Sequence, residues 1–147
     1  MLTNSDERSK RLTRRMKRRS LSRNGALLAY TSGEKVEIRD MASGTTRTIS
    51  GLTPLAVRWS PVDDRLAVRG LRSIYTMNSL GTELRTLNAD HADASDSSVD
   101  WSPDGTWLVV SIPEIGLLSR TTIVDAQSGL LLPLRLSAGQ GISWAPN

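Results

Sequence analysis

The side chains best suited to chemistry in this sequence form an acidic group between residues 90 and 100. It comprises Asp90, His91, Asp93, Asp96 and Asp100. Carboxylate oxygens bind Ca²⁺, which takes about six to eight oxygen ligands, but this spacing fits no EF-hand loop. Asp alternating with Ala and Ser is also ordinary loop composition. We expect a solvated loop without a metal, in which the first four residues offer a contact to a partner; calcium binding is the alternative.

The sequence lacks the residues that most catalytic sites require. It contains no cysteine and one histidine, which excludes disulfides, zinc–thiolate sites, cysteine nucleophiles and multi-histidine metal sites. There is no Gly-x-Ser-x-Gly nucleophile elbow and no glycine pattern of a phosphate-binding or dinucleotide-binding loop. We therefore expect a protein that is not an enzyme and that has no catalytic residues and no cofactor.

Basic residues are concentrated at the N-terminus. Residues 1–24 hold nine Lys or Arg and two Asp or Glu, a net charge of +7, whereas residues 25–147 have a net charge of −3. Such a run repels itself and stays solvated, so residues 1–23 are expected to form a mobile or helical arm. The alternative is binding of nucleic acid or an anionic surface through residues 8–23. The candidate anion contacts are Arg14, Arg15, Lys17, Arg18 and Arg19.

An internal repeat organises the remaining chain. Three tryptophans, separated by 42 and 43 residues, share one context: Trp59-Ser60-Pro61, Trp101-Ser102-Pro103 and Trp144-Ala145-Pro146. The second copy continues into Asp104-Gly105, and Asn24-Gly25 fits the same frame without the tryptophan. Both Gly dipeptides predict hairpins with type I′ turns.

A second hairpin recurs in each unit. A β-rich run ends in Asp40, Asn78 or Asp125, passes a Gly turn and returns as a strand. Each unit of about 42 residues therefore contains four short strands, as a propeller blade does. The sequence predicts an all-β partial β-propeller of about three four-stranded antiparallel blades. Their expected ranges are 24–55, 56–97 and 98–141, with the start of a further blade at 142–147.

The Trp-Ser-Pro-Asp-Gly signature resembles the TolB-like, WD-repeat-like β-propeller family, and Trp101–Val110 is the nearest copy. The resemblance covers about residues 20–147 and implies a non-enzymatic module for protein–protein interaction. Prolyl-oligopeptidase-like serine peptidases also carry propellers, so an accessory domain without its catalytic half is an alternative function. The missing signal peptide favours the cytoplasm. The resemblance implies the periplasm if an upstream export signal was lost.

The repeat also assigns structural roles. Trp59, Trp101 and Trp144 are expected to pack between blades, because a large ring buries much area. Each following Ser is expected to bond the turn backbone, and each Pro to end the strand. Trp107 departs from the spacing and is expected to be an exposed aromatic that contacts a partner.

Three blades do not close a ring, since propellers have about four to eight. We therefore expect either a fragment of a longer propeller or a homodimer that completes one. No apolar run approaches the roughly 18 residues that a membrane-spanning helix needs.

Overall fold

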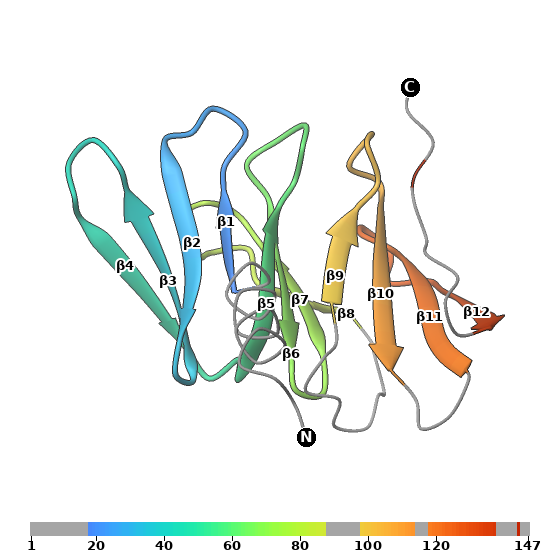
Figure 1. The fold of residues 1–147 in the computed structure, drawn as a ribbon. Helices are drawn as coiled ribbons and strands as arrows, with labels where there is room; N and C mark the ends of the chain where they lie inside the picture. Colours follow the sequence, from blue (N-terminus) through green and yellow to red (C-terminus); the bar gives the residue numbers. More distant parts are fainter. Residues whose placement is uncertain (1–17, 88–97, 114–117, 138–143, 145–147) are drawn as a thin grey trace, which may run out of the picture.

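A computed structural model describes residues 18–87, 98–113, 118–137 and 144 (Figure 1). The described residues contain strands and no helix, arranged in three four-stranded antiparallel sheets that fan out side by side. Blade 1 consists of β1 (Arg19–Leu21), β2 (Leu27–Ser32), β3 (Lys35–Asp40) and β4 (Thr46–Ser50). Blade 2 consists of β5 (Pro54–Trp59), β6 (Leu66–Gly70), β7 (Ile74–Met77) and β8 (Arg85–Leu87). Blade 3 consists of β9 (Ser98–Trp101), β10 (Trp107–Pro113), β11 (Leu118–Asp125) and β12 (Leu131–Ser137).

In each blade, sequential strands pair with their neighbours, so the chain runs from the first strand to the fourth without a crossover. The first strands of successive blades lie next to one another: β5 contacts β1, and β9 contacts β5. This is the blade arrangement of a β-propeller, and the expected all-β partial propeller of three blades is confirmed.

The hydrophobic core forms two layers between the blades. Blade 1 packs on blade 2 through a cluster that includes Val36, Val57 and Leu66, and blade 2 packs on blade 3 through one that includes Ile74 and Leu108. All five residues of β6 are buried, because blade 2 is covered on both faces. Alternation of apolar and polar residues is thus lost in this strand, as expected for a strand with two buried faces.

The first strand lies where the sequence predicts an arm. Arg19–Leu21 pairs antiparallel with Leu28–Tyr30, so blade 1 begins several residues before the expected boundary at residue 24. Because four arginines lie between residues 14 and 19, the sequence around the first strand reads as a charged arm. The strand forms because it pairs with β2, not because its residues have a high strand propensity. Residues 1–17 lie outside the described residues.

The turn between the first two strands of a blade differs from the expected type I′. Among the described non-glycine residues only Thr53 and Glu83 have positive φ, so Asn24 and Asp104 do not. In blade 3 the amide of Gly105, at φ +71°, donates to the carbonyl of Ser102. Ser, Pro, Asp and Gly in this order suit a type I turn, with Pro at its second position and Gly at its fourth. Pro103 therefore shapes the turn rather than only ending the strand.

The serine that follows each first strand holds this turn. The Ser102 hydroxyl accepts a hydrogen bond from the amide of Trp107 at 2.9 Å and donates to Asp104 Oδ1 at 2.6 Å. Ser22 repeats both contacts with Leu27 and Asn24. In blade 2, Val62 and Asp63 replace Asp-Gly, and the hydroxyl of Ser60 accepts only a longer bond, at 3.3 Å, from the amide of Val62.

In each blade, an Asp or Asn side chain holds the turn between the third and fourth strands. Oδ1 of Asp40 accepts hydrogen bonds from the amides of Ala42 and Ser43, both at 2.9 Å. Asp125 binds the two corresponding amides in the same way, whereas Oδ1 of Asn78, in a turn one residue shorter, accepts from the amides of Leu80 and Thr82. These local bonds explain why an Asp or Asn ends each third strand.

The turn carboxylate Asp104 predicts loss of stability in acid. The hydroxyl of Ser102 and then the hydroxyl and amide of Thr106 donate to it, which lowers its pKa from 3.8 to about 2. Because the pKa of the folded state lies below the ordinary value, the carboxylate stabilises the fold above about pH 4, and this stabilisation is lost as the pH falls toward 2. Urea midpoints measured against pH should fall less steeply in Asp104→Asn than in wild type. Glu34→Gln, in the exposed β2–β3 turn, should keep the wild-type slope; equal slopes in all three proteins contradict the prediction.

Candidate binding grooves between the blades

The repeat tryptophans lie at the boundaries between blades. Trp101, 4% exposed, ends β9, and its Nε1 donates to the carbonyl of Arg58 in blade 2 at 2.9 Å. The guanidinium of Arg65 lies 4.9 Å from the centre of the Trp101 ring. Trp59, 6% exposed, ends β5 and packs in the cluster with blade 1, but its Nε1 has no hydrogen-bond partner among the described residues.

The other residues expected to form sites are placed as follows. Trp107 is half-buried rather than exposed, because it is the first residue of β10 and pairs with Asp125 of β11. Asp100 is exposed in β9, and its Oδ1 accepts a hydrogen bond from the amide of Trp101. Arg18 and Arg19 are exposed. Pro61 is exposed, and Trp144 is half-buried. The described residues do not include the other expected contacts, which are Asp90, His91, Asp93, Asp96, Arg14, Arg15 and Lys17.

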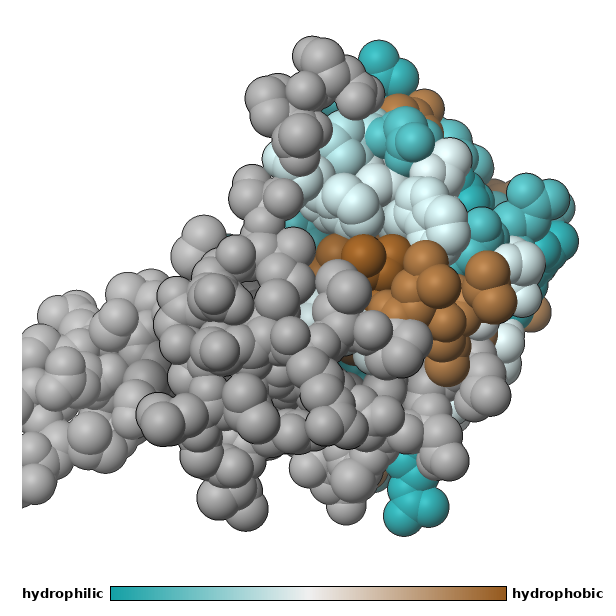
Figure 2. All heavy atoms as spheres, turned by 90° about the vertical axis from the view of Figure 1, so that its right-hand side faces the viewer, coloured by the Kyte–Doolittle hydropathy of each residue, from teal (hydrophilic) through white to brown (hydrophobic). Residues whose placement is uncertain are grey.

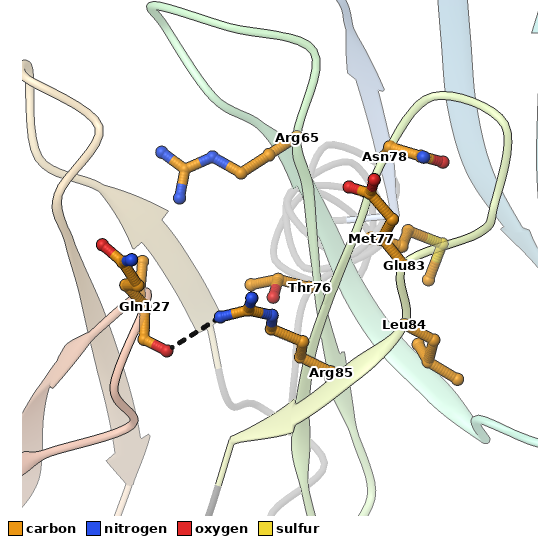
Figure 3. A pocket seen from close by; sticks show the side chains of 9 residues that line it. Arg65, Thr76, Met77, Asn78, Glu83, Leu84, Arg85 and Gln127 are labelled. Atoms are coloured by element: carbon orange, nitrogen blue, oxygen red, sulfur yellow. Dashed lines mark hydrogen bonds between the residues drawn. The ribbon is translucent and has the colours of Figure 1, made fainter.

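A groove of about 540 Å³ opens between blades 2 and 3 (Figure 3). It is lined by Arg65 from the β5–β6 turn, by Glu83, Leu84 and Arg85 from the approach to β8, and by Gln127 from the β11–β12 turn. Arg85 spans it, since its Nη1 donates to the carbonyl of Gln127 at 3.1 Å. Buried Thr76, Met77 and Ala126 also contribute to the lining. We call this groove 2–3.

The charges in groove 2–3 differ in their freedom to bind a ligand. Arg65 is engaged, because it forms an ion pair with Asp63 at 2.8 Å and donates to the carbonyl of Gly105 at 2.6 Å. Glu83 and Arg85 are exposed, and so is Leu84 between them, at 48%. The groove therefore presents a cation, a carboxylate and an apolar side chain in three consecutive residues.

A second groove of about 650 Å³, groove 1–2, lies one blade earlier. Its lining includes Arg23, Trp59, Asp63, Asp64 and Ser79. The hydroxyl of Ser79 donates to Asp64 at 3.0 Å, and Arg23 reaches the carbonyl of Val62 at 3.4 Å. Its polar groups are thus largely bonded to one another, which leaves groove 2–3 with more groups available to a ligand.

Neither groove was predicted from the sequence. Each combines side chains from two blades, and Arg85 and Gln127 are 42 positions apart. The Asp or Asn at the end of each third strand is the sequence feature that could have indicated where groove 2–3 lies. Asn78 lines this groove, and the turn after Asp125 supplies Gln127. Within the part of the chain that the structure describes, no cluster of three or more His, Cys, Asp or Glu side chains could hold a metal ion.

Solved structures with the same fold are β-propellers. TolB from Acinetobacter baumannii is 20% identical, with a TM-score of 0.60, over 80% of this chain and 31% of that protein. The β-propeller domain of the Trilobed protease from Pyrococcus furiosus is 16% identical, with a TM-score of 0.60, over 84% of this chain and 42% of that domain. An oligogalacturonate lyase in complex with manganese is 16% identical, with a TM-score of 0.56, over 80% and 41% of the two chains.

This chain therefore spans less than half of the length of these propellers. No protein-family model and no curated protein sequence matches it. Among the described residues, no helix is long and apolar enough to cross a membrane. At these identities the likeness concerns the fold, and the chain is a partial β-propeller of the kind found in TolB.

Proposed function

We propose that this chain is a non-enzymatic protein-interaction module that binds an extended segment of a partner protein in groove 2–3. The observation that carries the proposal is the run Glu83-Leu84-Arg85, exposed along a groove of about 540 Å³. Turns and loops positioned by a rigid sheet scaffold are common binding surfaces. The catalytic motifs missing from the sequence support a binding role rather than catalysis.

The groove favours a segment that carries a carboxylate beside an apolar side chain. A carboxylate would accept charge-assisted hydrogen bonds from Arg85, which now uses one donor on the carbonyl of Gln127. An apolar side chain would cover Leu84, which is 48% exposed. Glu83 would disfavour a second acidic residue next to the first, which gives the groove selectivity.

A random-peptide display library tests this proposal. Panning on wild type should enrich peptides with an acidic residue next to an apolar one, and Arg85→Glu should abolish their binding in fluorescence anisotropy. The matched control Arg39→Glu reverses the charge of another exposed strand arginine, outside the groove, and should keep wild-type affinity. Failure to enrich any sequence class, or equal binding by Arg85→Glu, would count against groove 2–3 as the binding site.

A second proposed function is that of an accessory propeller of a serine peptidase. It is supported by the likeness to the β-propeller domain of the Trilobed protease. It predicts a Gly-x-Ser-x-Gly nucleophile elbow encoded in the same reading frame after Asn147. Sequencing the transcript beyond that codon decides between an accessory domain and a separate module.

A further inference from the structure

Arg69 is a charged side chain buried in the apolar core. It is 0% exposed, and it is the only charged residue that the described part of the chain buries. Arg69 of β6 pairs with Ala56 of β5 and with Ile74 of β7, and Ile74 pairs with Leu87 of β8. These three neighbours belong to the cluster between blades 2 and 3. Since residues paired across a sheet share one face, Arg69 points toward blade 3 among apolar side chains.

The head of this side chain lies at the rim opposite groove 2–3. Nη1 donates hydrogen bonds to the carbonyls of Gly70, at 2.9 Å, and Ser73, at 3.4 Å, in the turn between β6 and β7. Strand β6 leads from the turn that holds Arg65, in groove 2–3, to this turn at its other end (Figure 1). Ser73 is half-buried and Arg72 is exposed. The guanidinium therefore lies behind a surface turn, held by one of its three nitrogens.

The other two nitrogens of the guanidinium have no hydrogen-bond partner among the described residues. Nε carries one N–H group and Nη2 carries two, so three donors lack an acceptor. A buried donor without an acceptor costs free energy, because folding removes the water that it binds in the unfolded chain. An acceptor at this edge of the guanidinium would remove that cost.

The positive charge of Arg69 needs compensation as well. Burial lowers the pKa of Arg69, but the ordinary pKa of a guanidinium lies so far above neutrality that the group stays protonated. No carboxylate of the described residues forms an ion pair with it, since the ion pair between described side chains joins Arg65 to Asp63. A water molecule would accept the hydrogen bonds but leave the charge uncompensated. An anion is therefore the partner that satisfies both requirements.

Blade 3 does not provide this anion from its described residues. Those that enter the cluster facing Arg69 are apolar and include Val99 and Val110, which pair with each other. The side of the molecule that blade 3 forms also carries a hydrophobic patch, as Figure 2 shows. Apolar surroundings exclude water and strengthen the attraction between opposite charges. A small anion beside Arg69 would thus be held strongly.

We propose that Arg69 binds a small oxyanion, a carboxylate or a phosphate, as a structural anion between blades 2 and 3. Nε and Nη2 lie on one edge of the planar guanidinium, so two oxygens of the ligand accept parallel hydrogen bonds from them. Nη1 keeps its bonds to the turn carbonyls and thereby fixes the direction of that edge. The anion is enclosed when the two blades pack. This site is separate from groove 2–3, and its test does not depend on the function proposed for that groove.

The dependence of stability on anions tests this proposal. Wild type and Arg69→Met, whose side chain is long and uncharged, are unfolded in urea and refolded in Tris chloride without oxyanions. Thermal midpoints are then followed by circular dichroism as phosphate or acetate replaces chloride at constant ionic strength. The wild-type midpoint should rise by several degrees, in proportion to the logarithm of the oxyanion concentration at saturating levels. Arg69→Met should lose this rise.

Arg39→Met is the matched control, because Arg39 is an exposed arginine of blade 1. It should respond to oxyanions as wild type does, which separates the effect of Arg69 from general effects of salts on protein stability. The two oxyanions distinguish the sources of the ligand. A response to phosphate alone supports a phosphate site, and a response to acetate alone supports a carboxylate site.

Two results would overturn the proposal. Equal shifts in wild type and Arg69→Met would show that oxyanions act elsewhere on the protein. No shift in wild type would show that the chain itself supplies the acceptor. If Arg69→Met does not fold, the Nε–Hε signal of Arg69 in wild type is followed by NMR instead. This signal should move and saturate as phosphate or acetate is added, and an unchanged signal overturns the proposal.

Discussion

Trp101→Ala is expected to lower the free energy of unfolding by about 3–5 kcal/mol, the typical cost of removing a large buried aromatic side chain. Trp101 is 4% exposed in the cluster between blades 2 and 3, and its loss leaves a cavity there. It also deprives the Arg58 carbonyl of the Nε1 donor and removes the ring beneath Arg65. Since small domains are stable by only about 5–15 kcal/mol, urea denaturation should show a large shift of the midpoint.

A pair of phenylalanine variants isolates the hydrogen bond within this effect. Trp101→Phe keeps an aromatic ring but removes the bond to Arg58, whereas Trp59→Phe removes an Nε1 that has no partner among the described residues. Trp101→Phe should therefore cost about 1 kcal/mol more than Trp59→Phe. Equal losses in the two variants would show that the ring, and not the bond between blades, determines the contribution of Trp101.

Gly70→Ala is the second change with a large expected effect. A Cβ at this position would lie 2.5 Å from the carbonyl oxygen of Leu52, 2.8 Å from Cε2 of Tyr75 and 3.1 Å from the carbonyl oxygen of Ser73. Two of these neighbours are backbone atoms, so the clash cannot be relieved by a side-chain rotation. We expect a loss of about 3 kcal/mol, at the upper end of the range for overpacked sites.

The matched control for this prediction is Gly33→Ala. Gly33 has φ +59° and open space around its Cβ position, so alanine there bears only the left-handed backbone strain of about 1–2 kcal/mol. Gly70 has no positive φ, and its cost is purely steric. Chemical denaturation should place Gly70→Ala below Gly33→Ala in stability. The reverse order would mean that the β5–β6 bulge beside Pro54 shifts to make room.

The repeat made most of the fold predictable. The period of 42 and 43 residues reflects tryptophan contacts between blades, and the Asp or Asn at the end of each third strand reflects contacts within a blade; both recur because each blade is built alike. The first strand was missed because Arg19–Leu21 carries no local strand signal and is held by pairing with β2. The type I′ turn prediction was wrong because Ser-Pro-Asp-Gly bonds its own backbone in another way, with only Gly105 at positive φ.

The sequence by itself determined the all-β class and the number of blades, because local turns and a repeated pattern specify them. Only the tertiary structure decided how the blades meet. Groove 2–3 exists because Arg85 and Gln127 face each other from different blades, which no local pattern records. Likewise, only the neighbouring blade decides which alternate residues of a strand pack inward, as Val36 and Ile38 do between Lys35, Glu37 and Arg39.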